Sequence, residues 1–566
     1  MKLSKIVISI LLVMALATPA MASSNWVDDF LRRYDPSKTA ATTASNRTSN
    51  IAQFIRTGEV PVTLNDVINM MIDNNLDIRS NRLSPRSSYF QSLVFYRALQ
   101  PSLRFTANMG RDVVLSTTQL NGATSRIQDT GNYGVNFSQL LSTGTSLTVD
   151  MSLNRLLTNS NNSIYNPSYI GRLTYTVGQH LLRDRGRLIN LHQIMQGQNT
   201  EKISEIGFEI QLTNLIVQAQ KSYWDLVFAG QDLNVKQRSL ELAQQTLDEN
   251  KMKVEIGTLA PIDVVQTQAD VASRRDLLVV STYNVTAAED QIKKMTSSDK
   301  DPAMFLVKLR AEESPIRPEA VQIPGLEEAV RTALEDRPEM RQALLDLKNK
   351  GIDVEYTANQ RKPVFDITAS YNQNGTGGTQ RRGFVLGSPA LTQAIPGSVF
   401  DAFGQLFSYG YNGVSAGFSI VIPLSNKAAD ADHDRAINEQ RLSQSKIDVT
   451  AQQIALDVRN ALMQVEMNRA RIDTAKATRE FAQQKMEAEQ TKFSLGTSTL
   501  RFVLEEQRNV AQAESNELQT VVNFTKSLVD LDKAMGLTLT KNNIEIDKTL
   551  NPVALNVRRG SSASAN

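Results

Sequence analysis

The apolar positions of this chain follow two different periods, and the two alternate along its length. From 101 to 179, and again from 363 to 424, apolar and polar residues alternate, which is typical of half-buried β-strands. Arg187–Ile256 and Asn426–Leu495 have a helical pattern instead, and each is 70 residues long. A helix of that length extends about 105 Å at 1.5 Å per residue. The pattern therefore predicts two strand regions, each followed by a very long helix.

The second long helix has the spacing that packing between long helices requires. It contains neither Gly nor Pro, and Ile447, Ile454, Val465 and Ile472 are 7, 11 and 7 residues apart. Each interval is close to a whole number of helical turns, so these four side chains lie on one face. We expect this helix to pack as in a coiled coil.

A Gly-Thr break follows each long helix, at Gly257-Thr258-Leu259 and at Gly496-Thr497-Ser498. The two copies are 239 residues apart, and six of the sixteen positions that begin at these glycines are identical. After each break a second helix returns, to about Ser297 and to about Met535. Glycine adopts backbone conformations that other residues resist, so the sequence predicts two helical hairpins with tips at 257 and 496.

A shorter helix precedes each strand region. Thr63 to about Leu99 is helical in pattern, and Asp66, three residues after Thr63, approximates a capping box. A related block begins at Leu326, 262 residues after Leu64. Each half of the chain is thus expected to contain a helix, a strand region and a long helical hairpin, as an internal two-fold repeat.

The N-terminus has the three parts of a secretory signal peptide. A basic start is followed by the apolar run Ile6–Ala17 and by a small-x-small cleavage site at Ala20-Met21-Ala22, which predicts removal of residues 1–22. The alternative is a retained membrane anchor, but the run is shorter than the roughly 20 residues needed to span a membrane. Residues 23–60 are rich in Ser, Thr, Asn and Ala and are expected to be a flexible leader.

These patterns also set the other boundaries. We expect the first repeat at 61–300, a proline-rich linker at 301–323, the second repeat at 324–540, and a polar tail at 541–566 that frays. Within the second strand region, Asn372–Gly410 is Gly-rich and polar, and is expected to be a long exposed loop.

Composition argues against several functions. The chain has no cysteine, which excludes disulfides, thiolate metal sites and a lipid-bearing N-terminal cysteine. Without the two lysines of the signal peptide the net charge falls from +2 to about zero, so no nucleic-acid partner is expected. His180, His192 and His433 lack metal-ligand spacing, and Gly375–Gly378 lies in a polar stretch. Carboxylates on the helices alternate with Lys and Arg, as on solvated faces. We therefore expect no enzyme, no cofactor and no metal site.

The order of these elements resembles the TolC-like outer-membrane efflux protein family. The resemblance rests on the Gly-Thr tips, on the strand exits Gln179–Arg183 and Ile422-Pro423-Leu424, and on Asp336-Arg337-Pro338-Glu339, and it covers about residues 60 to 540. It implies an α+β membrane protein, in which a long antiparallel α-helical coiled-coil barrel joins a transmembrane β-barrel shared between three protomers. Each protomer would give four strands to a barrel of twelve.

Two features of the sequence depart from that family. His180 stands where the family commonly has proline after the strand, whereas the second half keeps Pro423. The first strand region also offers four alternating segments where the family needs two. Either one long strand is counted twice or 101–179 contains an extra hairpin, and the sequence leaves both open.

The resemblance further implies a function. The protein would be the outer-membrane channel of a tripartite efflux or type I secretion system, a passive homotrimeric duct in outer-membrane lipid that extends into the periplasm. A periplasmic adaptor and an inner-membrane transporter would be its partners. The alternative is a periplasmic or surface structural coiled-coil protein, and a cargo-binding periplasmic protein is a weaker third option.

The family also suggests which residues form a gate, because its tips carry acidic residues six and nine positions after the glycine. Asp263 matches the first of these positions, Phe502 departs from it, and Glu505 matches the second. In a trimer, Asp263 and Glu505 would face a narrow periplasmic pore and favour bound cations. Alternatively, Asp263 only stabilises the start of the returning helix. The tips themselves (Gly257, Thr258, Leu259, Gly496, Thr497 and Ser498) would contact the adaptor.

Overall fold

The computed structural model describes residues 59–117, 122–160, 162–297, 305–316, 318–382, 393–547 and 556–559. The predicted signal peptide, most of the predicted leader and parts of the predicted linker and tail lie outside these ranges. The described residues belong to two compact units. We call 91–197 with 349–440 the sheet unit, and the described parts of 45–90, 198–348 and 441–566 the helical unit.

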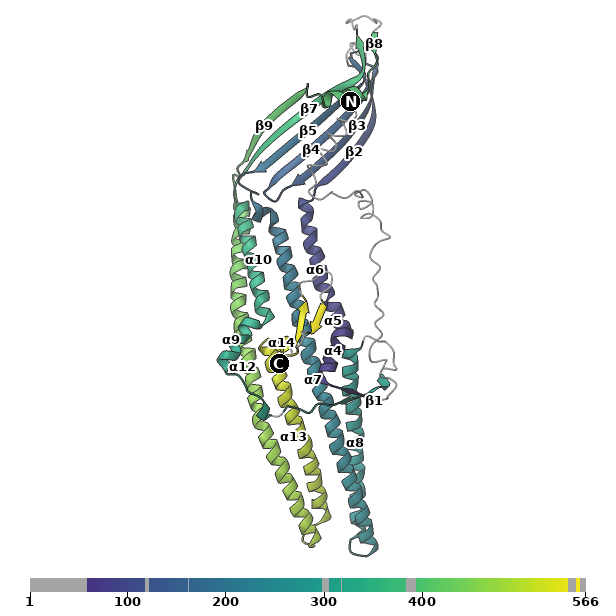
Figure 1. Ribbon diagram of the computed structural model, residues 1–566, viewed down its shortest axis with the longest axis vertical. Coiled ribbons are helices and arrows are strands. Elements are labelled where there is room, and N and C mark those ends of the chain that lie inside the picture. The colour runs from purple at the N-terminus through teal and green to yellow at the C-terminus, as the bar shows by residue number, and fades with distance from the viewer. Residues whose placement is uncertain are drawn as a thin grey trace, which may run out of the picture. The chain divides into compact units, whose positions relative to one another are not determined.

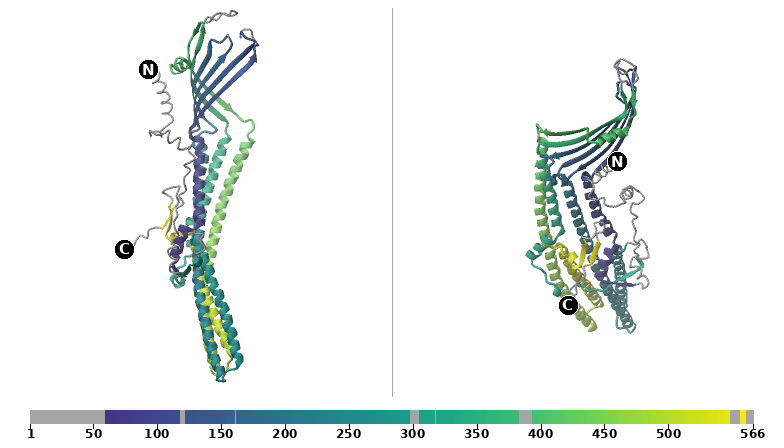
Figure 2. Two further views of the ribbon diagram at one scale, coloured as in Figure 1. Left: turned by 90° about the vertical axis from the view of Figure 1, so that its right-hand side faces the viewer. Right: turned by 45° about the horizontal axis from the view of Figure 1, so that its top comes forward.

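The sheet unit contains one antiparallel sheet, whose long strands follow the order β2-β3-β4-β5-β7-β9 (Figure 1). The short strand β8 pairs with the far end of β7. The views of Figure 2 show the same strands side by side. The strands are β2 Ser102–Leu115, β3 Ser125–Leu140, β4 Thr145–Thr158, β5 Tyr165–His180, β7 Val364–Arg382, β8 Gln393–Ile395 and β9 Asn412–Val421.

The four alternating segments of 101–179 are four separate strands, so the extra hairpin is the correct alternative. The sheet therefore has six long strands, two more than the four that the family resemblance implies as each copy's share of the barrel. β3 and β4 are separate strands because a tight turn joins them, in which the Leu141 N–H donates to Thr145 O at 2.8 Å. Gly144 closes the turn with φ +85°, a conformation that side chains other than glycine resist.

The register gives the sheet one apolar and one polar face. Because side chains alternate along each strand, residues paired across all six long strands lie on the same face. One row is apolar, and the adjacent row is polar or glycine. The first consists of Leu103, Phe137, Val149, Tyr175, Tyr371 and Val414, and the second of Arg104, Asn136, Asp150, Thr174, Asn372 and Gly413.

The predicted exposed loop at 372–410 is partly wrong. Its first residues continue β7 as far as Arg382, and α11 (Val399–Leu406) packs on β7 and β5. The glycines that suggested a loop make room for this helix, since a Cβ at Gly375 would lie 2.1 Å from Ala402 O. A Cβ at Gly171 would lie 2.9 Å from a methyl carbon of Leu406. Glycine here serves close packing rather than flexibility.

Two long helical hairpins supply most of the helical residues. α7 and α12 are 69 and 68 residues long, close to the 70 expected, and α8 and α13 return alongside them (Figures 1 and 2). None of the described helices is both long and apolar enough to cross a membrane. The helices are α4 Leu64–Asn74, α5 Leu76–Asn81, α6 Leu83–Val94, α7 Arg187–Glu255, α8 Pro261–Thr296, α9 Leu326–Asp336, α10 Pro338–Gln360, α12 Lys427–Ser494, α13 Leu500–Ala534 and α14 Thr538–Lys541, with 3₁₀ turns η2 Phe95–Leu99 and η5 Pro318–Ala320.

The start of α4 confirms the predicted cap. Thr63 Oγ1 accepts from the Asp66 N–H at 3.2 Å, and Asp66 Oδ2 accepts from the Thr63 N–H at 3.1 Å. This reciprocal pair satisfies two backbone donors that would otherwise lack partners at the helix start.

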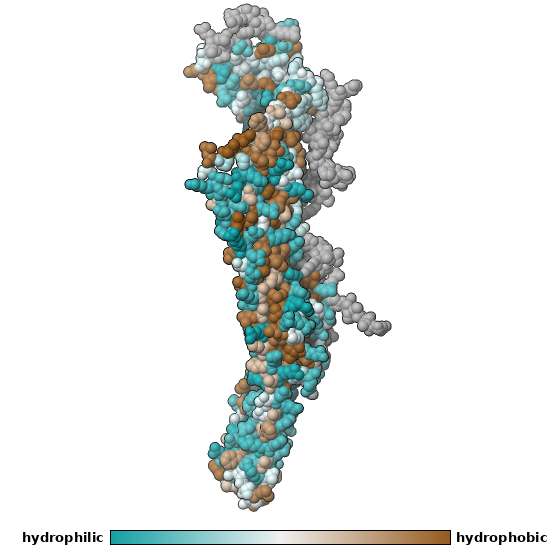
Figure 3. Space-filling model, turned by 90° about the vertical axis from the view of Figure 1, so that its left-hand side faces the viewer, coloured by the Kyte–Doolittle hydropathy of each residue, from teal (hydrophilic) through white to brown (hydrophobic). Residues whose placement is uncertain are grey.

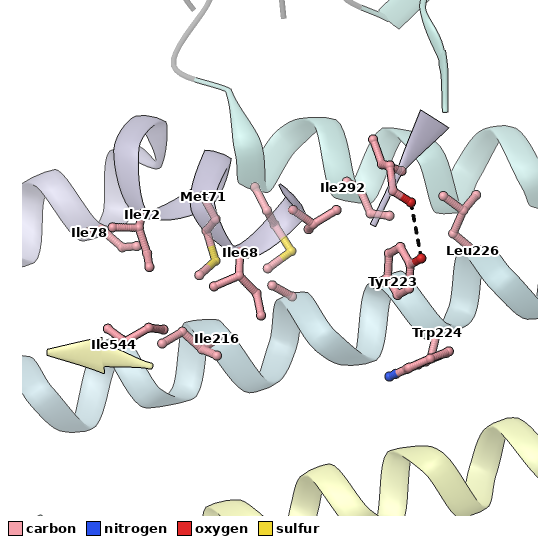
Figure 4. Close-up of a cluster of buried hydrophobic side chains, with 14 of the residues drawn as sticks. Ile68, Met71, Ile72, Ile78, Ile216, Tyr223, Trp224, Leu226, Ile292 and Ile544 are labelled. Carbon is pink, nitrogen blue, oxygen red and sulfur yellow. Dashed lines mark hydrogen bonds between the residues drawn. The ribbon is translucent and has the colours of Figure 1, made fainter. Parts of the chain in front are cut away.

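The largest apolar cluster of the helical unit gathers around α4 and α7 (Figure 4). Trp224 is buried there. Tyr223 is fully buried and donates its hydroxyl to Val62 O at 3.2 Å. Ile544 is also buried in this cluster, so the chain does not fray from Lys541 as expected.

Two small sheets complete the helical unit. β1 (Glu59–Val62) pairs in parallel with β6 (Lys308–Ala311), which joins the end of the predicted leader to the predicted linker. β10 (Ile544–Asp547) pairs antiparallel with β11 (Asn556–Arg559). Neither sheet was expected, because four-residue strands have too few alternating positions to stand out in a sequence.

Candidate functional site: the hairpin tips

The first tip closes α7 with two backbone hydrogen bonds. The Gly257 N–H donates to Val254 O at 3.0 Å, and the Thr258 N–H donates to Lys253 O at 2.9 Å. This is a Schellman cap, and Gly257 supplies its left-handed residue at φ +76°. The Thr258 hydroxyl donates to the same Lys253 carbonyl at 3.0 Å, which explains why threonine follows the glycine.

The second tip repeats this cap at the end of α12. Gly496 has φ +74°, its N–H donates to Phe493 O at 3.0 Å, and the Thr497 N–H donates to Lys492 O at 2.9 Å. The Thr497 hydroxyl also donates to the Lys492 carbonyl, at 3.1 Å. The two tips approach each other, because the Lys253 ammonium lies 5.8 Å from the ring centre of Phe493, within cation–π range.

Both tips expose a large apolar side chain. Ile256 and Leu495, which directly precede the two glycines, are each 74% exposed. A Cβ added to Gly257 or Gly496 would meet no atom within 4 Å, so the turns face open space within this chain. The sequence motif singled out the glycines, whereas these apolar residues become notable only once their exposure is known.

The predicted gate residues lie just beyond the tips. Asp263 and Phe502 occupy the same place, the third residue of α8 and of α13. Asp263 is half-buried, Phe502 is 50% exposed, and Glu505 is exposed. Phe502 and Glu505 are three residues apart and so share a helix face. Asp263 lies in the first turn of α8, where the helix dipole also favours a carboxylate.

A buried polar cluster that the sequence did not indicate joins α7, α8 and α13. Arg274 Nε donates to Asp270 Oδ2 at 2.7 Å, and its Nη1 donates to Ser239 Oγ at 2.8 Å. Its Nη2 donates to Gln507 Oε1 at 3.4 Å, and Arg508 Nε lies 3.5 Å from Asp270 Oδ1. Burial lowers the pKa of Arg274, against the opposing effect of Asp270. The predicted solvated face is wrong for Asp270 and Arg274, whose side chains are 5% and 2% exposed.

A second ion pair links α12 and α13 of the other hairpin, next to the predicted gate. Lys485 Nζ lies 2.7 Å from Glu506 Oε1, and the Glu506 side chain is buried. The hydrogen bond from Lys485 lowers the pKa of Glu506. Glu505 and Glu506 therefore differ, because Glu506 is held within the hairpin and Glu505 is exposed.

The segment Asp336-Arg337-Pro338-Glu339 forms the junction between α9 and α10. Arg337 Nη2 donates to Glu339 Oε1 at 2.9 Å, and its Nη1 donates to Asp457 Oδ2 of α12 at 3.0 Å. Burial acts to raise the pKa of Glu339, but the hydrogen bonds and charge of Arg337 outweigh it and lower that pKa. This segment, which is part of the family resemblance, thus links the junction of α9 and α10 to α12.

His180, the departure from the family pattern, lies at the end of β5. Its Nδ1 is 2.6 Å from Oδ1 of Asp366 on the neighbouring strand β7. This contact ties the exit of β5 to the start of β7, a position where proline could not make a side-chain hydrogen bond.

Comparison with known proteins supports the family resemblance. Residues 329–537, which include the second tip, match the model of the family described as "Outer membrane efflux protein". The resemblance to the TolC-like efflux proteins is confirmed. No curated protein sequence matches the chain.

Solved outer-membrane channels share the fold of this chain. The Campylobacter jejuni CmeC outer membrane channel has a TM-score of 0.58 and 16% identity, over 87% of this chain and 88% of its own. The open state of the Neisseria gonorrhoeae MtrE outer membrane channel has a TM-score of 0.57 and 17% identity, over 84% and 89%. The Vibrio cholerae outer membrane protein VceC has a TM-score of 0.57 and 11% identity, over 84% and 96%.

The family match and the shared fold together support an efflux channel of the outer membrane that extends into the periplasm. A purely structural coiled-coil protein is not favoured. The matching family and the similar structures are channel proteins rather than enzymes.

Proposed function

We propose that this efflux protein is a passive trimeric duct, and that its three copies pool their sheets into one transmembrane β-barrel. The observation that carries the proposal is the sheet, in which an apolar row lies beside a polar row across all six long strands. A barrel wall needs this arrangement, because one face meets lipid and the other meets water. An open sheet edge is untenable in lipid, so copies must join to close it.

The long hairpins would continue the duct through the periplasm as a coiled-coil barrel. The second hairpin supports this role, since Ile454, Val465 and Ile472 of α12 are buried in one apolar cluster with residues of α13 and α9. The two halves of the chain would act as an internal repeat, which the equal Schellman caps at Gly257 and Gly496 support.

We place the gate at Asp263, Phe502 and Glu505, beside the hairpin tips. In a trimer, three copies of each carboxylate would crowd one narrow opening, where rings of acidic side chains select cations. The two tips would contribute unequally, because Phe502 occupies in α13 the place that Asp263 occupies in α8.

The tips would also receive the periplasmic adaptor of a tripartite efflux or type I secretion system. Ile256 and Leu495 support this role, since paired exposed apolar side chains at the end of a rigid hairpin offer area to bury on binding. An inner-membrane transporter would then supply energy and select the cargo.

Extraction and migration test the channel against a coiled-coil rod. We expect a protein that leaves the outer membrane only with detergent and that migrates on gels as a heat-sensitive trimer. Release by salt alone, as a soluble rod, would contradict the proposed function.

Single-channel recording tests the gate. Asp263→Ala combined with Glu505→Ala should change the conductance and lower the cation selectivity in planar bilayers. Glu241→Ala is the matched control, an exposed carboxylate of α7 about 24 Å before the tip at 1.5 Å per residue, and should leave both unchanged. An unchanged current and selectivity in the double variant would sink the assignment of the gate.

A further inference from the structure

The two outermost long strands of the sheet each have an open edge. Within the part of the chain that the structure describes, β2 pairs only with β3, and β9 pairs only with β7. Every residue of β2 is exposed, as are nine of the ten residues of β9, whereas the strands between them are mostly half-buried. Exposed apolar side chains accompany both edges, among them Phe105 and Met109 on β2 and Val414 and Phe418 on β9. On the face that Figure 3 draws, apolar side chains lie among hydrophilic ones in the strand-bearing part and also along the helices.

Each of the six long strands is long enough to cross a membrane. A tilted transmembrane strand needs about 9–11 residues. The shortest strand, β9, has 10 residues, and β2 and β3 have 14 and 16. The strands of the first hairpin, β2 and β3, are therefore long enough to cross a membrane, as are the four strands that the family pattern expects.

The two faces of the sheet continue without interruption onto the first hairpin. The apolar row reaches Leu103 on β2 through Phe137 on β3, and the adjacent polar row reaches Arg104 through Asn136. A row of hydroxyls also crosses the sheet, with Ser102 Oγ 2.8 Å from Ser138 Oγ at one edge. A hairpin lying outside the barrel wall would not need one apolar face in register with the wall.

The base of this hairpin is fixed to the start of α7. The Gly186 N–H donates to Thr143 O at 3.2 Å, and a Cβ on Gly144 would lie only 2.5 Å from Asp184 O. The turn between β3 and β4 therefore packs tightly against the segment that leads into the first long helix. This contact holds β3 and β4 together as neighbours in one sheet.

Strand direction permits copies to join edge to edge. An antiparallel sheet with six long strands has edge strands that run in opposite directions. Copies related by rotation then place β9 of one beside β2 of the next, antiparallel, and the hydrogen-bond ladder continues around the ring.

We propose that each copy contributes six strands, and that β2 of one copy pairs with β9 of its neighbour. This inference rests on the proposed trimeric channel, in which three copies of six strands close a barrel of eighteen. Barrel diameter grows roughly linearly with strand number, so this barrel would be about 1.5 times as wide as one of twelve strands. The family pattern of four strands per copy would instead join β9 to β4 and leave β2 and β3 outside.

Cysteine cross-linking in the full-length protein distinguishes the two joints, since the natural chain contains no cysteine. Cysteine replaces Leu103 or Ala107 on β2, and in the same chain replaces Val414, Ala416 or Phe418 on β9. Directly paired residues have Cα atoms about 4.5–5.5 Å apart, within the range of a disulfide. The two edges lie on opposite sides of one sheet, so a disulfide between them must join two copies.

We expect at least one β2–β9 register to give covalent dimers and trimers on denaturing, non-reducing gels, with loss of most of the monomer band. Each single variant should run on these gels as a monomer without cross-links. A second series tests the four-strand joint: cysteine replaces Met151 on β4 instead of the β2 residue, and the β9 cysteines stay the same. These variants should not cross-link, because β3 and β5 already pair with the two edges of β4.

Cross-links in the β4–β9 series, or a trimer with no β2–β9 cross-link in any register, would overturn the six-strand joint. Light scattering in detergent separates this failure from failure of the proposed function. A protein that is not trimeric would contradict the channel itself, whereas a trimer joined through β4 would contradict only the present inference.

Discussion

Replacement of Arg274 by methionine tests whether the buried cluster holds the hairpins together near the gate. The change leaves the Asp270 carboxylate buried and removes its hydrogen bond of 2.7 Å. It also removes the donors that Ser239 and Gln507 now accept from. Arg508, at 3.5 Å and more than half exposed, is the remaining partner that could compensate.

Breaking a buried pair by removing one partner costs about 3–5 kcal/mol. Compensation by Arg508 sets the expectation at the lower end, about 3 kcal/mol, which corresponds to roughly a hundredfold change in an equilibrium constant. Arg274→Met with Asp270→Leu should recover most of this loss, because an apolar pair of similar volume is often neutral.

Native-state hydrogen exchange of α8 measures this local effect in the intact protein. Amides around Asp270 should exchange on the order of a hundredfold faster in Arg274→Met, and close to the natural rate in the double variant. Lys251→Met is the control, since its pair with Asp248 is exposed and worth at most about 1 kcal/mol. Equal exchange in the single variant and the natural protein would refute the role of the cluster.

Two further predictions concern stability. Gly257→Ala and Gly496→Ala should each lower the free energy of local opening at the tips by about 1–2 kcal/mol, as measured by hydrogen exchange, because φ is positive at both glycines. Gly230→Ala within α7 should be neutral or stabilising, and equal effects of all three substitutions would contradict the left-handed caps. Because Arg337 lowers the pKa of Glu339 below its ordinary 4.5, the pair stabilises the protein above that pH and loses this effect as the pH falls through the lowered pKa. Glu339→Gln should therefore reduce thermal stability at pH 7 but not in strong acid, and a pH-independent difference would argue against the pair.

The sequence was sufficient for features that depend on local chemistry. The cap at Thr63 and the two Gly-Thr turns each need a particular residue within one helical turn, so their residues identify them directly. The spacing of Ile447, Ile454, Val465 and Ile472 likewise predicted a shared face, because a helix repeats its faces at a fixed interval. The last three are buried in one cluster, whereas Ile447 is only half-buried.

Features that depend on distant partners could not be predicted. Asp270 and Arg274 have the spacing of an ordinary exposed pair, and the pair is buried because α7 and α13 pack against it. Gly375 resembled a loop residue because its contact, Ala402, lies on a helix that covers it. The strand count of 101–179 stayed open, since alternation alone does not show where one strand ends and the next begins.

Current through planar lipid bilayers tests the central claim most directly. Detergent-extracted trimers of the natural protein should insert and give discrete, uniform conductance steps. A trimer that inserts but passes no ions, with or without the gate substitutions Asp263→Ala and Glu505→Ala, would contradict the account of this protein as an outer-membrane duct.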